Sequence, residues 1–224
     1  NAAASQIQVI TVQDTILPVF TAPADITIYV DSACTYDVSV LHVGDVTDEW
    51  DNCSTGTEAT YSDAVAAGSC EGTYVIARTW SVVDNCGNAA ASQIQVITVQ
   101  DTTLPVFTAP ADITISTDSA CNFNVSVLHV GDVTDEWDNC STGIDATYSD
   151  VFTAGSCEGT YVITRTWSLM DNCGNAAASQ IQLITVQDTT LPAFTAPADI
   201  TIYVDSACTY DVSVLHVGDV TDEW

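Results

Sequence analysis

The chain has 224 residues and a formal net charge of −28 at pH 7, because 30 acidic side chains face only two basic ones, Arg78 and Arg165. This charge excludes nucleic acid as a partner, since nothing could neutralise the phosphates, and the same argument excludes anionic membranes. No apolar run approaches 18 residues, so the sequence predicts no transmembrane helix and no membrane insertion.

The sequence repeats with a period of 87 residues. Residues 1–87 and 88–174 are identical at 73 of 87 aligned positions, and residues 175–224 begin a third copy. A unit of this size buries only a marginal core, so we expect disulfides or metal ions to support it. The predicted divisions are the last strand of a preceding repeat at 1–13, repeats at 14–100 and 101–187, and the first part of a further, cut repeat at 188–224.

Alternating apolar and polar residues predict short β-strands in the first half of the second repeat. Residues 111–116 and 122–127 both alternate with a period of two, which is typical of half-buried strands. In the later strand, Phe123, Val125 and Val127 would face the core. The other copies keep an apolar or aromatic residue at each of these positions.

The second half of the repeat predicts longer strands. The longest one places Arg165 and Trp167 on the same face. The last strand, 179–187, changes its apolar phase between Leu183 and Ile184, which indicates a bulge or burial on both faces. No stretch shows a helical period. We therefore predict an all-β fold of tandem immunoglobulin-like antiparallel β-sandwich repeats.

Each complete repeat contains four cysteines, and Cys208 belongs to the cut copy. Four cysteines in a small unit indicate disulfides and an oxidising, extracellular setting. Zinc is the competing interpretation, but the chain has no close C-x-x-C pair. Four cysteines allow three pairings. We favour the one that ties both Asp-Asn-Cys loops at one end, beside the acidic residues: Cys34–Cys70, Cys53–Cys86, Cys121–Cys157 and Cys140–Cys173.

The order of short motifs resembles a known family. The second repeat contains, in order, D-T-T-L-P-x-F-T-x-P-A-D-I-T-I, S-A-C, G-D-V-T-D-E-x-D-N-C-S-T-G, S-C-E-G-T-Y-V-I-x-R-T-W and D-N-C-G-N-A-A. This order is similar to the HYR-like (hyalin-repeat-like) modules found in long arrays in surface proteins of Bacteroidota-type bacteria. The resemblance covers nearly the whole chain. It implies an immunoglobulin-like sandwich, secretion, a role in adhesion or extracellular fibres, and no enzymatic activity.

Acidic residues gather before two cysteines of each repeat and at the start of the next. Hard oxygen ligands of this kind suit Ca²⁺, and the D-x-x-G-N-x-A and D-T-T-x-P elements also resemble junctions of calcium-stiffened bacterial arrays. The alternative is a solvated acidic loop in which Asp and Asn make turns. The candidate ligands are Asp45, Asp48, Glu49, Asp51, Asp84, Asp101, Asp132, Asp135, Glu136, Asp138, Asp171 and Asp188.

Asp-Ser and Asp-Thr dipeptides recur at two fixed places in the repeat. They resemble the short signal for O-glycosylation in the same bacteria, although both dipeptides are also common in turns. The candidate acceptors of covalent glycans are Thr15, Ser32, Thr102, Ser119, Thr189 and Ser206.

The two arginines and the loop tryptophans complete the set of candidates. Arg78 and Arg165 are each the only cation of their repeat, so we expect a structural ion pair or stacking on an aromatic ring. Trp50 and Trp137 either cover the edge of the core or dock on a sugar or a neighbouring module. The histidines, one per repeat, are expected to lie exposed.

These observations favour a structural function. We predict a non-enzymatic repeat of a bacterial extracellular filament or adhesin shaft, which gives reach and stiffness on the cell surface. Its partners would be neighbouring repeats and identical chains in a filament. The alternative is an adhesive module that binds a glycan or a protein through its acidic and Trp-bearing loops.

Overall fold

The computed structural model describes residues 3–213 and 218–220, and it shows an all-β protein with two four-stranded sheets. No helix in the described part of the chain is long and apolar enough to cross a membrane. The chain divides into two compact units. The first comprises Asn1–Ala109, Val133–Tyr148 and Thr166–Gln180, and the second comprises Pro110–Asp132, Ser149–Arg165 and Ile181–Trp224, within the described residues.

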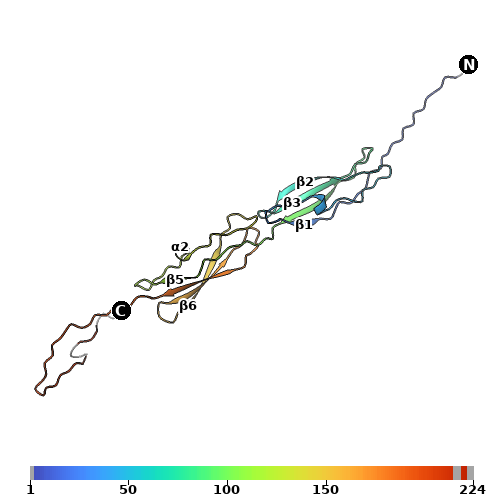
Figure 1. The fold of residues 1–224 in the computed structure, drawn as a ribbon. Coiled ribbons are helices and arrows are strands. Elements are labelled where there is room, and N and C mark those ends of the chain that lie inside the picture. Colours follow the sequence, from blue (N-terminus) through green and yellow to red (C-terminus); the bar gives the residue numbers. More distant parts are fainter. Residues whose placement is uncertain (1–2, 214–217, 221–224) are drawn as a thin grey trace. The chain divides into compact units, whose positions relative to one another are not determined.

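The first sheet has the strand order β1-β4-β3-β2 (Figure 1). β1 pairs with β4 in parallel, whereas β3 pairs antiparallel with both β2 and β4. The prediction of a purely antiparallel arrangement is therefore wrong for the first strand, which returns to lie beside the last one. The elements are β1 (Ile26–Tyr29), α1 (Val40–Val43), β2 (Thr60–Ala67), β3 (Tyr74–Ser81) and β4 (Gln93–Gln100).

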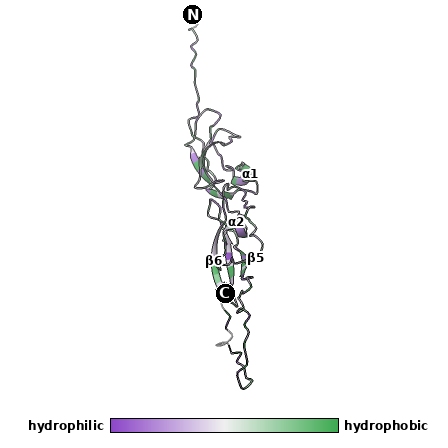
Figure 2. Ribbon diagram, turned by 90° about the vertical axis from the view of Figure 1, so that its left-hand side faces the viewer, coloured by the Kyte–Doolittle hydropathy of each residue, from purple (hydrophilic) through white to green (hydrophobic). Residues whose placement is uncertain are grey.

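The second sheet has the corresponding order β5-β8-β7-β6, and β5 again pairs in parallel with the last strand. Hydrophobic and hydrophilic stretches both occur on its labelled strands (Figure 2). Its elements are β5 (Ile113–Ser116), α2 (Val127–Val130), β6 (Thr147–Ala154), β7 (Tyr161–Ser168) and β8 (Gln180–Gln187).

One face of the first sheet is buried in two apolar clusters with a polar layer between them. Ile76 belongs to one cluster and Trp80 to the other, and both are fully buried on β3. Between them lies Arg78, which is 1% exposed and directly opposite Gln95 of β4. Irregular segments supply the facing layer, since Val43 of α1 and Val46 pack into the two clusters.

The arginine of this polar layer forms the predicted ion pair and stacks on an aromatic ring, although its buried Nη1 atom has no hydrogen-bond partner among the described residues. The Arg78 Nε and Nη2 atoms donate to the two carboxylate oxygens of Asp63, each at 2.8 Å, and Nη2 also donates to the Val38 carbonyl at 2.7 Å. The guanidinium lies 3.9 Å from the Tyr61 ring centroid. The hydrogen bonds with Asp63 raise the pKa of Arg78 despite its burial. In the second sheet, Arg165 pairs with Asp150.

The predicted bulge in the last strand is wrong. β4 keeps a continuous register with β3, and β8 keeps strict alternation with Gln182 and Ile184 buried. The apparent change of phase arises because buried glutamines precede the buried aliphatic residues. The Gln182 Nε2 donates to the Val130 carbonyl at 2.7 Å, which satisfies the buried amide, while Ile181 on the outer face is 61% exposed.

The strand predicted at 122–127 is also absent. The chain runs irregularly there and then forms the single turn α2, which Gly131 ends with a positive φ of 103°. Two of the three predicted inward-facing residues are nevertheless confirmed, since Phe123 and Val125 both pack against the core of the second sheet. The alternation reflects a segment that touches the core with every second residue but has no strand beside it to pair with.

Candidate metal centre and its flanking disulfides

Three loops of the first unit bring three aspartates together. One carboxylate oxygen from each of Asp14, Asp51 and Asp84 lies within 4.8 Å of the others. Asp51 and Asp84 are buried, at 7% and 6% exposure, and Asp14 is half-buried. We call this group the first triad.

Hydrogen bonds hold two of these carboxylates in place. Asp51 Oδ1 accepts the backbone N–H groups of Cys53 at 3.0 Å and Ser54 at 2.7 Å. Asp84 Oδ1 accepts those of Cys86 at 2.8 Å and Asn88 at 2.7 Å. Each aspartate is therefore fixed by the turn that it starts, and each of these turns carries a cysteine two residues later.

Two carboxylate oxygens of the triad lack partners within the described part of the chain, whereas Asp84 Oδ2 accepts a hydrogen bond from the Asn88 Nδ2 at 2.6 Å. Asp14 Oδ2 and Asp51 Oδ2 are buried and accept no hydrogen bond. A buried carboxylate oxygen without a partner is costly, and the repulsion between neighbouring carboxylates adds to that cost. A bound divalent cation would offset both, and Ca²⁺ prefers carboxylate and carbonyl oxygens.

No basic side chain of the sequence neutralises the triad, because the only two, Arg78 and Arg165, pair with Asp63 and Asp150. Burial raises the pKa of Asp84, but hydrogen bonds from Asn88, Cys86 and Gly87 outweigh it and lower that pKa below its usual value. Asp84 is therefore charged at neutral pH.

A second triad repeats this arrangement. Oxygens of Asp101, Asp138 and Asp171, all buried, again lie within 4.8 Å of one another. Asp138 Oδ2 accepts the N–H of Cys140 at 2.9 Å, and Asp171 Oδ1 accepts that of Cys173 at 2.8 Å. Asp101 Oδ2 and Asp138 Oδ1 are buried without partners.

The triads contain only part of the predicted ligand set. The structure places five of the predicted ligands in the triads: Asp51, Asp84, Asp101, Asp138 and Asp171. Asp101 lies with Asp138 and Asp171 in the second triad, whereas Asp84 lies in the first. The sequence interpretation missed Asp14, although it aligns with Asp101 in the repeat.

The remaining candidate ligands lie outside both triads, and those of the first repeat hold the backbone locally. Asp45 accepts the N–H of Val46, Asp48 that of Thr21 and Glu49 that of Ala59. Their counterparts outside the second triad are Asp132, Asp135 and Glu136, and Asp188 is exposed at the start of the cut copy.

The two disulfides connect the first repeat with the second. Cys34 bonds to Cys140 across 106 residues, and Cys70 bonds to Cys173 across 103 residues. The predicted bonds within a repeat, Cys34–Cys70 and Cys140–Cys173, are therefore wrong. Also wrong are Cys53–Cys86 and Cys121–Cys157, because all four of these cysteines are free and exposed, as is Cys208.

Chain continuity explains this pairing. The turns of Cys34 and Cys70 lie at the end of the first sheet where β4 finishes, since Tyr74 pairs with both Ala67 and Val99. One residue after β4, Asp101 enters the second triad. The turns that carry Cys140 and Cys173 start at Asp138 and Asp171 of that triad. The triad therefore brings these two cysteines close to Cys34 and Cys70 at the end of the first sheet.

Polar contacts reinforce the same connection. Glu71 accepts hydrogen bonds from the Thr142 N–H at 2.7 Å, the Thr142 hydroxyl at 3.0 Å and the Asn172 Nδ2 at 3.0 Å. These bonds lower the pKa of Glu71. The Asn139 Nδ2 donates to the Asp31 carbonyl at 2.8 Å. We call these contacts and the two disulfides the junction.

The other predicted sites lie at the surface. Trp50 is 60% exposed and Trp137 is 53% exposed, and His42 and His129 are exposed. His216 and Trp224 fall outside the described residues. The six candidate glycan acceptors, Thr15, Ser32, Thr102, Ser119, Thr189 and Ser206, are all exposed.

No family model matches the chain, and no curated protein matches it significantly.

Proposed function

We propose that this chain is a stretch of an extracellular shaft, built from tandem immunoglobulin-like modules with an 87-residue period, in a bacterial surface filament or adhesin. The modules are residues 14–100 and 101–187. The observation that carries the proposal is the junction, where two disulfides connect turns of one module to the triad loops of the next. A shaft must keep its joints closed under load, and covalent cross-links do so by limiting the states open to the chain.

The acidic triads extend this proposal to calcium. Asp14, Asp51 and Asp84 would hold one ion, and the second triad would hold another. Each ion would neutralise buried carboxylates and stiffen the turns that present the cysteines of the junction. Neighbouring modules, and identical chains in a filament, would be the partners of the shaft. Its strong negative charge keeps such a surface soluble through self-repulsion.

The extracellular location rests on the cysteines and on the resemblance to HYR-like modules. Disulfides form and persist in oxidising compartments. The exposed Asp-Ser and Asp-Thr turns would accept O-linked glycans there. The role proposed is mechanical, with no catalytic step.

A second candidate function is glycan binding through the Trp-bearing loops. The exposure of Trp50 and Trp137 favours it, because exposed aromatic rings stack on sugars. The burial of Asp138 in the second triad weakens it, since that carboxylate faces inward and offers nothing to a ligand at the surface.

Electron microscopy of the multi-repeat protein separates the two candidates. We expect straight rods or fibres in millimolar calcium, floppy chains after a chelator is added, and greater flexibility once a reductant opens the junction. Dispersed flexible monomers under all conditions, together with selective binding on a glycan array, would instead establish the binding module.

A further inference from the structure

The two disulfides follow one rule that the remaining cysteines also obey. Cys140 aligns with Cys53 one period earlier, and Cys173 aligns with Cys86. Each bond therefore joins a turn cysteine of one module, Cys34 or Cys70, to a triad cysteine of the following module.

Applied to the second module, the rule accounts for the free thiols. Cys121 and Cys157 are turn cysteines, and the triad cysteines Cys140 and Cys173 are already bonded to other partners. Cys53 and Cys86 are triad cysteines, and the turn cysteines Cys34 and Cys70 are likewise already bonded. Cys208 is the turn cysteine of the cut copy.

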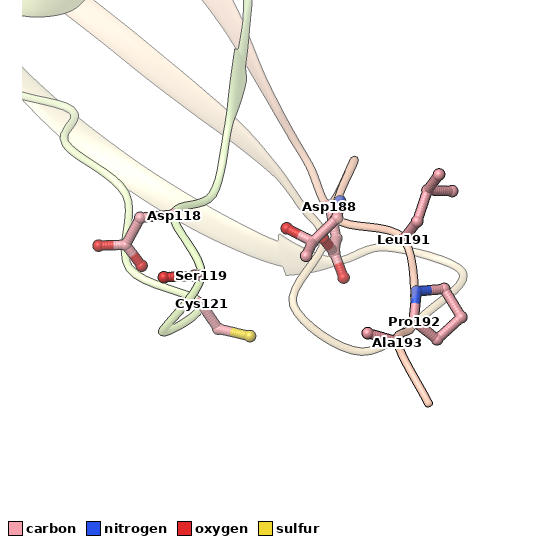
Figure 3. Close-up of a pocket in the computed structure, with 8 residues that line it drawn as sticks. Asp118, Ser119, Cys121, Asp188, Leu191, Pro192 and Ala193 are labelled. Atoms are coloured by element: carbon pink, nitrogen blue, oxygen red, sulfur yellow. The ribbon is translucent and has the colours of Figure 1, made fainter. Parts of the chain in front are cut away.

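The surface around Cys121 has the shape that such a partner requires. In the second unit, the Cys121 Sγ points into a hollow of about 510 Å³ (Figure 3). Asp118 and Ser119 line one side of this hollow, and Asp188 and Pro192 line the other. The hollow therefore gives a partner loop access to the thiol.

The matching glycines show how the bonded and free sites differ. A Cβ added at Gly72, beside Cys34, would lie 2.4 Å from the Cys140 Sγ, so the partner loop packs directly on this glycine. At the equivalent Gly159, the nearest described atoms are the Cys121 Sγ at 3.9 Å and an Asp188 carbon at 4.0 Å. At the bonded site, Cys140 fills the space next to Gly72. At the free site, the space next to the equivalent Gly159 is not filled by a partner cysteine.

The second thiol has its own hollow and its own acidic neighbour. Cys157 lines a hollow of about 360 Å³ together with Ser156 and Thr160. Glu158 follows Cys157 as Glu71 follows Cys70, and Glu71 is the acceptor of three junction hydrogen bonds. The residues that recognise the partner loops are therefore repeated beside the free pair.

The first module carries the loops that would dock on the site formed by Cys121 and Cys157. The loops D-N-C-S-T-G and D-N-C-G-N, which supply Asn139, Cys140, Thr142 and Cys173 to the junction, occur unchanged around Cys53 and Cys86. The first triad holds their backbone as the second triad holds the bonded loops.

We propose that Cys121 and Cys157 form a binding site for a further module of this repeat, and that Cys53 and Cys86 form the matching surface that docks on such a site. Cys121 bonds to a Cys53-type cysteine and Cys157 to a Cys86-type cysteine. This inference deepens the proposed shaft function and rests on its modular organisation. The incoming module belongs to a second copy of this chain, because the free triad cysteines that these 224 residues contain are Cys53 and Cys86.

Each bond forms by thiol–disulfide exchange. A thiolate of the pair attacks an oxidant disulfide, such as oxidised glutathione, and the partner thiolate then displaces the reduced oxidant. Two protons and two electrons leave the two thiols for each bond, and one oxidant disulfide becomes two thiols. A closed junction therefore consumes two oxidant disulfides.

The test extends the full chain by one segment. Trp224 aligns with Trp50, so a copy of residues 51–100 appended after Trp224 completes a third module in sequence. The appended segment adds copies of Cys53, Cys70 and Cys86 to the five free cysteines of the chain, so after oxidation with a glutathione redox buffer we expect the free thiol count to fall from eight to four. The matched control carries Ser at the appended copies of Cys53 and Cys86 and should keep Cys121 and Cys157 open to alkylation.

Disulfide mapping decides the outcome. Bonds from Cys121 and Cys157 to the appended Cys53-type and Cys86-type residues support the proposal. A Cys121–Cys157 bond, or two thiols that alkylate as fast as in the control, would overturn it. Disulfide mapping does not depend on rod stiffness. The docking proposal can therefore be supported while the shaft function is refuted, and the docking proposal can be refuted while the shaft function is supported.

The unextended chain identifies the source of the partner. The free triad cysteines available here are Cys53 and Cys86, in the same chain or in a second copy. Oligomers resistant to denaturant and sensitive to reductant, with Cys121–Cys53 and Cys157–Cys86 bonds between chains, support a second copy as the partner. Monomers from the unextended chain, with the expected bonds in the extended one, overturn the second copy as the partner and assign the partner to the same chain. A mixture of Cys53→Ser/Cys86→Ser and Cys121→Ser/Cys157→Ser chains should give one heterodimer if copies pair.

Discussion

Replacing Asp51 by Asn is expected to change stability in opposite directions with and without calcium. The amide keeps an oxygen to accept the N–H groups of Cys53 and Ser54, as Asp51 Oδ1 does. Its nitrogen replaces the unpartnered Oδ2 and can donate to Asp14 or Asp84. The substitution therefore removes one charge from the triad while the turn is retained.

The separation of the carboxylates sets the magnitude. Two unit charges 4.8 Å apart repel by about 3.5 kcal/mol at an effective dielectric constant of about 20. Asp51→Asn removes two of the three pairwise repulsions, which at this separation amount to about 7 kcal/mol before the structure relaxes. Point substitutions usually change the free energy of unfolding by about 0.5–3 kcal/mol, because the structure relaxes, so we expect about 1–3 kcal/mol of stabilisation in a chelator.

Calcium reverses the sign. An ion present at 100 times its dissociation constant stabilises the wild type by about 2.7 kcal/mol, and the variant loses most of this gain. Denaturant unfolding in chelator and in calcium measures both values, and calorimetric titration should show one fewer ion bound. The matched control is Asp48→Asn, because Asp48 is exposed and accepts only the Thr21 N–H outside the triad. Equal effects of Asp51→Asn in both media, or unchanged stoichiometry, would refute the metal centre.

Three further predictions concern the core and the junction. Arg78→Met leaves the Asp63 carboxylate, which is 23% exposed, without its partner and should lower the free energy of unfolding by about 1–3 kcal/mol; Asp63→Leu added to Arg78→Met should recover part of this in denaturant titrations, and a loss that stays undiminished would contradict the pairing argument. Gln95→Leu removes the donor to the buried Val43 carbonyl and to the part-buried Ala24 carbonyl, and should cost about 1–3 kcal/mol in the same assay; a neutral effect would show that the polar layer is dispensable. The lowered pKa of Glu71 means that its contribution is fully present above the unfolded value of 4.5 and is lost as pH falls through the folded pKa; Glu71→Gln should therefore flatten the acid limb of the stability curve, and an unchanged limb would remove Glu71 from the account.

The sequence predicts the core face well because burial follows local alternation. Ile163, Arg165 and Trp167 are buried on one face of β7, as the pattern indicates. The prediction fails for Gln182, since a buried glutamine is satisfied only by carbonyls that are distant in sequence, among them Val130. Polarity alone does not reveal such a partner.

The same 13-residue sequence at two places shows the limit of local reasoning. Residues 1–13 and 88–100 are identical, yet Gln93–Gln100 forms β4 while residues 3–13 form no strand and are exposed. β4 exists because β1 and β3 pair with it on both sides. Strand formation here depends on the neighbours, which the segment itself does not encode.

The candidate site was predictable in its chemistry but not in its assembly. The clustered aspartates and the cysteine spacing indicate oxygen ligands and disulfides. Grouping Asp14 with Asp51, and bonding Cys34 to the following module, requires knowledge of which sheet ends meet. The repeat alignment could have supplied Asp14, because Asp101 was already a candidate at the same position of the next repeat.

The most direct test of the account is the disulfide map of the oxidised chain. The protein should be digested without reduction by endoproteinases that cut at acidic residues, because only two basic residues are present. Mass spectrometry should then find peptides linked through Cys34–Cys140 and Cys70–Cys173. Cys34–Cys70 and Cys140–Cys173 links would place the bonds inside modules, and they would contradict a covalent junction as the basis of the shaft.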